Sequence, residues 1–533
     1  MHNQLITIAD TIEQWKILQR SVAHLASIFE VKEITARCGK EHGEFSSVEK
    51  AWNRLMKKVA SKRLVKAHCT QQRLEEFLAH NRKMEDIQKK VEEYLDEKRT
   101  EFPRLYFISN EELLQLLSQR ELKNLEPQLN KLFDQLHRFL KSADADVQDV
   151  LGMISADGEV VEFGKPVKGS GAAQKGVEAW LRDIRDYMVE AVRRRIRDAL
   201  GELNKETAER HEWVLRHCGQ AVAVVSMLSW TESVEAAIAE MEEERFALAN
   251  LLDHAKVTLM QLVELIRGTN LTSVQRKALT ALITHEVHNR DIIEELAEAR
   301  VELVDDFAWK RCLRYYSEDE AVVVRQVNAT LKYGYEYQGV ASRLVITPLT
   351  DRCWLTITGA LHIKLGASPK GPAGTGKTES TKDLAKGLGI FCLVFNCSEQ
   401  IEYRVMTRIF SGVVQSGVWT CLDEFNRINV EVMSVIAQQL GDIRQAKLVG
   451  SETCYLNDRS MTINPSCGVF ITMNPGYQGR AELPDNLKVL FRAVSMMIPA
   501  YGLVAQVMLF SEGFEGAEHL ATKMVQLYKL SSE

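Results

Sequence analysis

The last third of the chain alternates short continuous apolar runs with segments of helical pattern. The apolar runs are Ile390–Asn396, Gly417–Leu422, Gly468–Met473 and Val494–Ile498. Runs of this length are typical of strands that are buried on both faces of a parallel sheet. The segment Glu379–Leu388 is polar, rich in Ala, Leu and Lys, and free of proline, which favours a helix. The pattern therefore predicts an α/β domain built on a parallel sheet.

Residues 1–310 show a different pattern, with apolar residues at helical spacing and dense charge between them. The turn-rich stretch Ser155–Gly176 interrupts this pattern. Within it, Glu159–Phe163 and Lys165–Lys168 predict a small β-hairpin, followed by a flexible tether of glycine and serine. We expect a mostly α-helical N-terminal region of helical bundles with this hairpin as an insertion. One apolar stripe at helical spacing is formed by Trp180, Leu181, Ile184, Tyr187, Met188, Ala191 and Val192.

Residues 371–378 read Gly-Pro-Ala-Gly-Thr-Gly-Lys-Thr and match the phosphate-binding pattern G-x-x-x-x-G-K-[ST]. In such a loop the backbone N–H groups curl around the phosphates. The lysine neutralises the β and γ oxygens, and the threonine hydroxyl ligates Mg²⁺. The sequence therefore predicts a site for ATP and Mg²⁺ that is formed by Gly371, Pro372, Ala373, Gly374, Thr375, Gly376, Lys377 and Thr378.

The strand that should lead into this loop fits poorly. Gly366–Lys370, directly before the loop, lacks the apolar run of a central strand. Leu355–Leu365 is the better candidate, although five residues separate it from the loop. A helix is expected near the end of the chain, over Ala517–Leu530.

An acidic pair, Asp423 and Glu424, directly follows the run Gly417–Leu422. At the carboxyl end of a buried strand, Asp423 is placed to hold Mg²⁺ and its water shell, and Glu424 to polarise the water that attacks the γ-phosphate. The alternative is that the pair only caps a helix that starts near Asn429. The phosphate-binding loop upstream favours the catalytic interpretation.

Asn474 follows the next apolar run and should reach the same edge of the sheet. We expect its amide to orient the attacking water or to contact the γ-phosphate, so that Glu424, Asn474 and Lys377 form the predicted catalytic set. In isolation, Asn474-Pro475-Gly476 would be a plain turn. Arg492 closes a helix expected from about Pro484, where its simplest role is a solvated cation at a helix end.

The stretches that carry these motifs resemble the first AAA+ module of a dynein heavy chain, closer to the axonemal than to the cytoplasmic group. They are GPAGTGKTESTKDLAKGLGIFCLVFNCSE, CLDEFNRINVEVMSVIAQQL and ITMNPGYQGRAELPDNLKVLFR. The resemblance extends upstream through VVVRQVNATLKYGYEYQG and RLVITPLTDRCW. The helical half resembles the dynein linker, most recognisably in FPRLYFISNEELLQLLSQ and GVEAWLRDIRDYM.

This resemblance implies a division of the chain. Residues 1–310 would be a helical linker truncated at its N-terminus, residues 311–350 the segment that leads into the AAA+ module, and residues 351–533 the large ATPase subdomain without its lid. The segment Val345–Thr350 would wrap the adenine, although its residues alone indicate only a strand and a proline turn. Arg492 would project toward the nucleotide of a neighbouring module. The implied base contacts are Val345, Ile346, Thr347, Pro348 and Leu349.

Composition limits the remaining possibilities. The chain has 533 residues, a formal net charge of −6 and 45% hydrophobic residues, which suits two or three globular domains. Arg193-Arg194-Arg195 is followed by acidic residues in a net acidic chain, so we expect no nucleic acid partner. No stretch is expected to cross a membrane, because a span needs roughly 18 apolar residues. Ten scattered cysteines without metal spacing predict free thiols of a reducing compartment, and His285 with His288 lacks a further metal ligand.

The resemblance implies an ATPase that couples its ATP cycle to linker swing and to microtubule-based movement of cilia and flagella. The implied partners are the remaining AAA+ modules of the ring, and dynein intermediate and light chains and microtubules through the parent motor. The implied locations are the cytoplasm, the cytoskeleton and the axoneme. Because the sequence holds no lid, further module, stalk or tail, we expect a fragment of a larger motor. The alternatives are a non-catalytic nucleotide-binding, assembly or regulatory component and an unrelated AAA+ remodeller.

Overall fold

The computed structural model describes residues 2–118, 122–142, 149–168, 176–204, 210–241, 245–268, 270–340, 342–456, 459–475 and 482–532. Contacts group the chain into two compact units. The first is Met1–Gln128 with Ser170–Arg182, and the second is Leu129–Gly169 with Asp183–Glu533. The predicted class is confirmed, since a mostly helical N-terminal region precedes an α/β region with a parallel sheet. The three-part division by sequence stays a prediction about domains.

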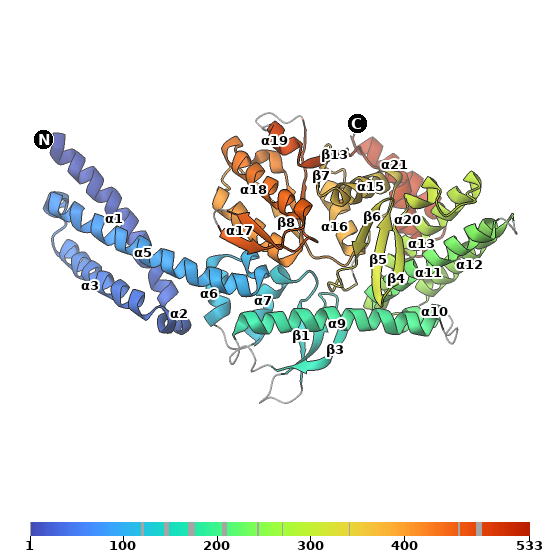
Figure 1. Cartoon of the computed structure of the whole chain (residues 1–533), viewed down its shortest axis with the longest axis horizontal. Coiled ribbons are helices and arrows are strands. Elements are labelled where there is room, and N and C mark those ends of the chain that lie inside the picture. Colours follow the sequence, from blue (N-terminus) through green and yellow to red (C-terminus); the bar gives the residue numbers. More distant parts are fainter. Residues whose placement is uncertain are drawn as a thin grey trace. The chain divides into compact units, whose positions relative to one another are not determined.

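Three long helices pack against one another in the first unit (Figure 1): α1 (His2–Phe29), α3 (Gly39–Ser61) and α5 (Gln71–Glu101). The ring of Trp15 on α1 lies 5.5 Å from the ring of Phe77 on α5. Thr70 caps α5 by accepting a hydrogen bond from the N–H of Arg73 at 3.3 Å, and so fixes where this helix begins. The shorter elements here and at the boundary are α2 (Lys32–Arg37), α4 (Val65–His68), η1 (Pro103–Phe107), α6 (Asn110–Ser118) and α7 (Leu122–Leu132).

The second unit opens with an antiparallel sheet of β1 (Arg138–Lys141), β2 (Val150–Ile154) and β3 (Val160–Val167). The predicted insertion is therefore present, but its two expected halves form the single strand β3, which pairs with β2. The turn lies earlier, where Gly158 has a φ of +90° that suits glycine. The predicted tether falls largely on residues 169–175, which lie outside the described residues.

Helices follow in the same unit, beginning with the part of α9 (Val177–Leu203) that comes after Arg182. They continue with the short α10 (Arg210–Arg216), the long α11 (Gly219–Glu240), α12 (Ala247–Arg267) and α13 (Ser273–Ala299), and the short α14 (Phe307–Lys310). The rings of Trp230 and Trp309 lie 5.3 Å apart within the core of α11, α12 and α13. The predicted stripe of α9 is buried, except that Tyr187 is half-buried.

The helix α11 is an exception to the expectation that no stretch of the chain is apolar enough to cross a membrane. By length and composition it is apolar enough to cross a membrane, and it is the single such helix in the part of the chain that the structure describes. The structure buries 61% of its apolar window, and the core helix of a globular protein passes the same test.

A five-stranded sheet in the order β13-β7-β12-β9-β8 carries the C-terminal part of the unit, and every pairing in it is parallel. Its strands are β7 (Gly366–Lys370), β8 (Cys392–Asn396), β9 (Trp419–Asp423), β12 (Gly468–Ile471) and β13 (Phe491–Ser495). The helix α16 (Lys377–Gly387) packs on one face, with α15 (Pro348–His362) against it. The helices α17 (Tyr403–Ser416) and α18 (Val430–Val449) lie on the other face (Figure 1). The four predicted strand runs are confirmed within a few residues.

The remaining elements surround this sheet. A second antiparallel sheet, of β4 (Arg314–Glu318), β5 (Ala321–Gln326) and β6 (Ala329–Lys332), precedes α15. The hairpin of β10 (Thr453–Leu456) and β11 (Arg459–Thr462) follows α18. The others are η2 (Phe425–Arg427), α19 (Asp485–Lys488), α20 (Tyr501–Ser511) and α21 (Ala517–Ser532), the last of which confirms the expected terminal helix.

The strand before the phosphate-binding loop was predicted wrongly. Gly366–Lys370 forms β7 between β13 and β12, whereas most of Leu355–Leu365 belongs to the helix α15. Glycine is required at the start of β7, because a Cβ at Gly366 would lie 2.4 Å from the carbonyl oxygen of Val469. A short strand in tight contact with its neighbours therefore carries no run of large apolar side chains.

Two further local predictions are wrong. Residues 345–347 form no strand, and Thr347 caps α15 with Pro348 in its first turn, a helix-start signal that reads like a proline turn. The helix after Pro484 covers only Asp485–Lys488, so Arg492 lies on the strand β13 and not at a helix end.

Asp134, between α7 and β1, makes the stability of the fold depend on pH. Burial first, and then the Glu336 carboxylate, raise the pKa of Asp134 from 3.8 to about 6, against the opposing effects of Lys386, Gln338 and Lys382. When folding raises the pKa of an acid, the folded protein loses stability as pH rises, here from 3.8 through about 6. We therefore expect Asp134→Asn to raise the free energy of unfolding by roughly 3 kcal/mol at neutral pH, and by nothing below about pH 4. Urea unfolding across this range checks it, and a gain that is independent of pH would contradict it.

Candidate nucleotide-binding site

The loop between β7 and α16 has the backbone shape that its sequence predicts. Gly374 and Gly376 have φ values of +75° and +78°, which residues with side chains rarely adopt. Gly371 packs so tightly that a Cβ there would lie 2.2 Å from the carbonyl oxygen of Met496. Helix α16 begins directly after Gly376, so its N-terminal N–H groups and the positive end of its dipole face the loop.

Lys377 is bent back over this loop and is 7% exposed. Its ammonium donates hydrogen bonds to the carbonyl oxygens of Gly371 at 3.0 Å and Pro372 at 2.5 Å. The hydroxyl of Thr375 lies 3.4 Å away. These acceptors are neutral, and charged acceptors form stronger hydrogen bonds with an ammonium group. A phosphate that enters the loop is therefore a better partner for Lys377 than the carbonyl groups it now contacts.

Asp423, at the end of β9, accepts hydrogen bonds from two hydroxyl groups on the same carboxylate oxygen. Thr378 at the start of α16 donates to its Oδ1 at 2.7 Å, and Thr472 after β12 donates to the same atom. Among the described residues, no side chain donates a hydrogen bond to its other carboxylate oxygen, Oδ2. A hydroxyl and a carboxylate side by side form an oxygen donor set that suits Mg²⁺.

Glu424 has a left-handed backbone, with φ of 51° and ψ of 42°. Its carboxylate forms an ion pair with Arg427 and accepts a hydrogen bond from the amide of Asn474 at 3.3 Å. Asn426 donates to the carbonyl oxygen of Asn474 at 3.2 Å, which fixes this segment after β12. The acid and the amide predicted for catalysis therefore meet at one edge of the sheet.

One pocket of about 440 Å³ collects these groups, a volume within the usual range for small-molecule sites. Gly371, Pro372 and Thr375 lie behind it and hold Lys377. The other predicted residues of the phosphate and metal site all line it. Its lining is Ala373, Gly374, Gly376, Lys377, Thr378, Glu379, Lys382, Val394, Asn396, Asp423, Glu424 and Asn474.

Sequence reasoning missed Glu379, Lys382 and Val394 of the pocket lining and three further residues of this site. Thr472 bonds Asp423, Arg427 pairs with Glu424, and Asn396 lines the pocket from the end of β8. Asn396 was detectable, because it ends a predicted parallel strand and so had to lie at the same edge as Asp423. Thr472 and Arg427 carry no such signal, since their roles depend on side-chain contacts formed only after folding.

The predicted adenine contacts and Arg492 lie elsewhere. None of Val345, Ile346, Thr347, Pro348 and Leu349 lines the pocket at the loop, and Ile346 and Pro348 line a separate pocket beside α13. Arg492 is exposed on β13, where it pairs in register with Ala367 of β7. Both roles remain predictions.

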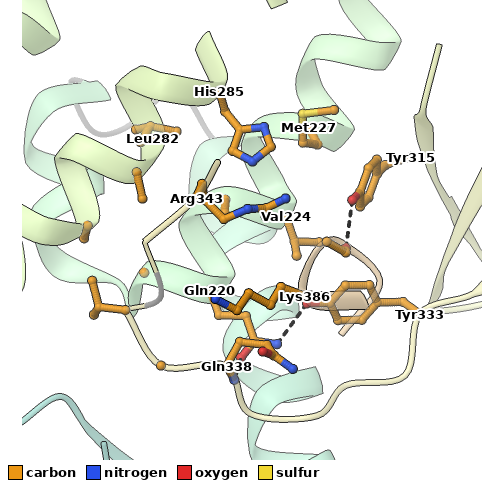
Figure 2. A pocket seen from close by; sticks show the side chains of 17 residues that line it. Gln220, Val224, Met227, Leu282, His285, Tyr315, Tyr333, Gln338, Arg343 and Lys386 are labelled. Carbon is orange, nitrogen blue, oxygen red and sulfur yellow. Dashed lines mark hydrogen bonds between the residues drawn. The ribbon is translucent and has the colours of Figure 1, made fainter. Parts of the chain in front are cut away.

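A small second pocket, of about 60 Å³, lies beside the C-terminal end of α16 (Figure 2). Arg343 on its wall donates from Nε to Asp383 Oδ1 at 3.0 Å and from Nη2 to Asp383 Oδ2 at 3.3 Å. Tyr315 donates its hydroxyl to the carbonyl oxygen of Gly387 at 2.8 Å. These bonds tie β4 and the segment before α15 to the helix that carries Lys377 and Thr378.

His285 also lines this second pocket. Burial, then the positive charge of Arg343, then His288, hold the pKa of His285 well below its usual range, so its ring is neutral. Within the described ranges, no group of three or more His, Cys, Asp or Glu side chains is placed to hold a metal. All ten cysteines are free thiols.

We expect Arg343→Ala to lower the free energy of unfolding by about 3 to 5 kcal/mol, because the Asp383 carboxylate would stay buried without its partner. Asp383 is 2% exposed. Urea unfolding measures the change, and adding Asp383→Asn should recover part of it. Arg325→Ala is the matched control, since its pair with Glu318 is 41% exposed on both sides and should cost under about 1 kcal/mol. Equal losses in the two arginine variants would contradict the assignment.

Taken together, this geometry defines a P-loop nucleotide-binding domain on a parallel sheet, preceded by a long helical region. The family described as the hydrolytic ATP binding site of the dynein motor region matches residues 333–533. The family described as dynein heavy chain, N-terminal region 2, matches residues 1–199. The chain belongs to the dynein heavy chains, as its sequence motifs predicted.

The similar proteins are much longer than this chain. Human dynein axonemal heavy chain 6 is 43% identical over 552 residues, which cover 99% of this chain and 13% of that protein. Human dynein axonemal heavy chain 3 is 43% identical over 533 residues, with the same two shares. The dynein-1-beta heavy chain of the flagellar inner arm I1 complex of Chlamydomonas reinhardtii is 40% identical over 534 residues, 99% of this chain and 12% of that protein.

Proposed function

We propose that residues 351–533 form the large ATPase subdomain of an AAA+ motor module, which binds ATP with Mg²⁺ and hydrolyses the γ-phosphate bond. One observation carries this proposal. Lys377 and Thr378 of the P-loop, Asp423 and Glu424 of the acidic pair, and Asn474 come from three separate segments and line one pocket. The family match to a hydrolytic ATP-binding site supports the same conclusion.

Binding follows from the groups in the loop. Backbone N–H groups of residues 373–376 and the N-terminus of α16 surround the phosphates, and Lys377 moves from its carbonyl partners to the β and γ oxygens. Thr378 and Asp423 would hold Mg²⁺, which neutralises charge that develops on the phosphates during transfer. The proton of the Thr378 hydroxyl already points to Asp423 Oδ1, so the oxygen lone pairs of Thr378 are left for the metal.

Hydrolysis needs a base and an amide that hold the attacking water. Glu424 takes a proton from the water, and Asn474, whose amide is within 3.3 Å of its carboxylate, orients the same water. Arg427 now neutralises Glu424, so this ion pair must loosen before the carboxylate acts as a base. We also propose that Val345–Leu349 contact the adenine and that the exposed Arg492 reaches the nucleotide of a neighbouring module.

We further propose that this module works within a longer dynein motor of cilia or flagella. The relatives are named axonemal or flagellar dynein heavy chains, and the chain spans 12–13% of their length. Residues 1–310 would act as the linker that swings with the ATP cycle. Further ring modules, intermediate and light chains and microtubules would be the partners of the whole motor, in the cytoplasm, the cytoskeleton and the axoneme.

A non-catalytic role in nucleotide binding or assembly is the second candidate, and one observation favours it. The carboxylate of Glu424 is engaged by Arg427 and Asn474, so it is not poised as a base in this structure. A site that stays in this arrangement would bind ATP without turnover.

Binding and turnover of ATP separate the two candidates. We expect residues 1–533 to bind ATP, and turnover to appear in a longer chain that supplies the downstream ring modules. Binding without turnover in the longer chain would favour the non-catalytic role. Binding by neither chain would contradict both.

A further inference from the structure

Thr472, directly after β12, uses every polar group it has at the edge of the parallel sheet. Its N–H donates to the carbonyl oxygen of Leu422 at 3.0 Å, and its own carbonyl oxygen accepts from the N–H of Phe425 at 3.0 Å. Its hydroxyl accepts from the N–H of Glu424 at 3.1 Å and donates to Asp423 Oδ1. The residue is 1% exposed and does not line the pocket.

These bonds hold the backbone of Glu424 in an unfavourable conformation. Its left-handed φ of 51° is disfavoured for a residue with a side chain. The N–H groups of Glu424 and of the next residue, Phe425, both donate to Thr472. The backbone conformation in turn determines where the carboxylate of Glu424 points, so Thr472 fixes the position of the proposed base.

The same hydroxyl fixes the carboxylate proposed to face the metal. A lone pair of the Thr472 hydroxyl oxygen accepts the hydrogen bond from the N–H of Glu424, so the hydroxyl proton is directed to Asp423 Oδ1. Thr378 donates to the same oxygen from the opposite element, α16. The two hydroxyls, from two separate elements, hold Asp423 through Oδ1, and Asp423 lines the pocket.

We propose that Thr472 is a positioning residue that holds Asp423 and Glu424 in register with one hydroxyl group. This inference rests on the proposed function of the site. The hydroxyl oxygen of Thr472 joins the side chain of Asp423, which is proposed to hold the metal, to the backbone of Glu424, which is proposed to activate the water. A shift of either acidic residue is therefore passed to the other, although Thr472 itself touches neither ATP nor metal.

Thr472→Val tests this role, since valine keeps the shape and loses the hydroxyl. Thr420→Val is the matched control, because Thr420 is 0% exposed in the adjacent strand β9 and donates only to the carbonyl oxygen of Leu393, at 3.2 Å. Thr472→Ser is the conservative variant, because serine keeps a hydroxyl group at this position. The first readout is amide hydrogen exchange of residues 423–427 without nucleotide, and the second is the factor by which Mg²⁺ strengthens ATP binding.

In Thr472→Val, we expect exchange at residues 423–427 to rise about ten-fold or more, and the Mg²⁺ factor to fall by a similar amount, since bonds to charged and strained groups are lost. Thr472→Ser should stay close to the wild-type chain. Equal behaviour of Thr472→Val and Thr420→Val would overturn the proposal, because a general loss of packing would then explain both. A wild-type chain that binds no ATP would refute the proposed function, while the exchange result would still decide whether Thr472 holds Glu424.

Discussion

Glu424→Gln is expected to give a chain that binds ATP as tightly as the wild type and does not hydrolyse it. Glutamine keeps the size of the side chain and an acceptor oxygen for the amide of Asn474, but it has no basic carboxylate to take a proton from water. In a longer chain that shows turnover, we expect kcat to fall about a thousand-fold, with the ATP affinity changed less than about three-fold. Single-turnover hydrolysis and equilibrium binding measure the two effects separately.

Glu431→Gln is the control for this substitution, since Glu431 is an exposed carboxylate in the first turn of α18. It should leave both quantities unchanged. Full turnover in Glu424→Gln would show that another group activates the water, and a loss of ATP binding would show that Glu424 acts mainly in holding the site together.

Lys377→Ala is expected to weaken ATP binding strongly. The ammonium is the one side-chain cation that the loop directs back over its own carbonyl groups, and it is the group that would neutralise the β and γ oxygens. We expect a loss of about a hundred-fold or more in affinity, because charge-assisted hydrogen bonds to phosphate are strong. Titration with a fluorescent ATP analogue checks it.

Lys382→Ala is the matched control for the loop lysine. Lys382 lines the same pocket, but it is bound to Glu379 at 3.0 Å and lies one turn further along α16. We expect its loss to weaken ATP less than about five-fold. If the two lysine variants lose affinity equally, the pocket attracts nucleotide by its general charge and not through the P-loop.

The chemistry of this site was predictable from the sequence because it depends on local patterns. A glycine-rich loop needs Gly374 and Gly376 at positive φ, so their spacing is visible in the chain itself. Asp423 and Asn474 were found because each follows an apolar run, and parallel strands end at a common edge. Periodicity alone also predicted the buried stripe of α9.

Some errors arose where tertiary contacts override local preference, and others where a local signal fits two structures. β7 begins with Gly366 because the carbonyl oxygen of Val469 lies within 2.4 Å of where a Cβ at that position would be, which no single-sequence pattern reveals. Thr347 and Pro348 begin a helix, although a proline after a β-branched pair reads as a turn. The roles of Thr472 and Arg427 depend on their side-chain contacts with Asp423 and Glu424, which form only after folding and leave no pattern in the sequence.

The structure of the Glu424→Gln chain with ATP and Mg²⁺ bound tests the central claim most directly. The account predicts phosphates against the N–H groups of residues 373–376, with the ammonium of Lys377 moved from the carbonyl oxygens of Gly371 and Pro372 onto the nucleotide. It also predicts the metal beside Thr378 and Asp423. Nucleotide found elsewhere on the chain, or Lys377 still bound to its loop beside a bound nucleotide, would contradict it.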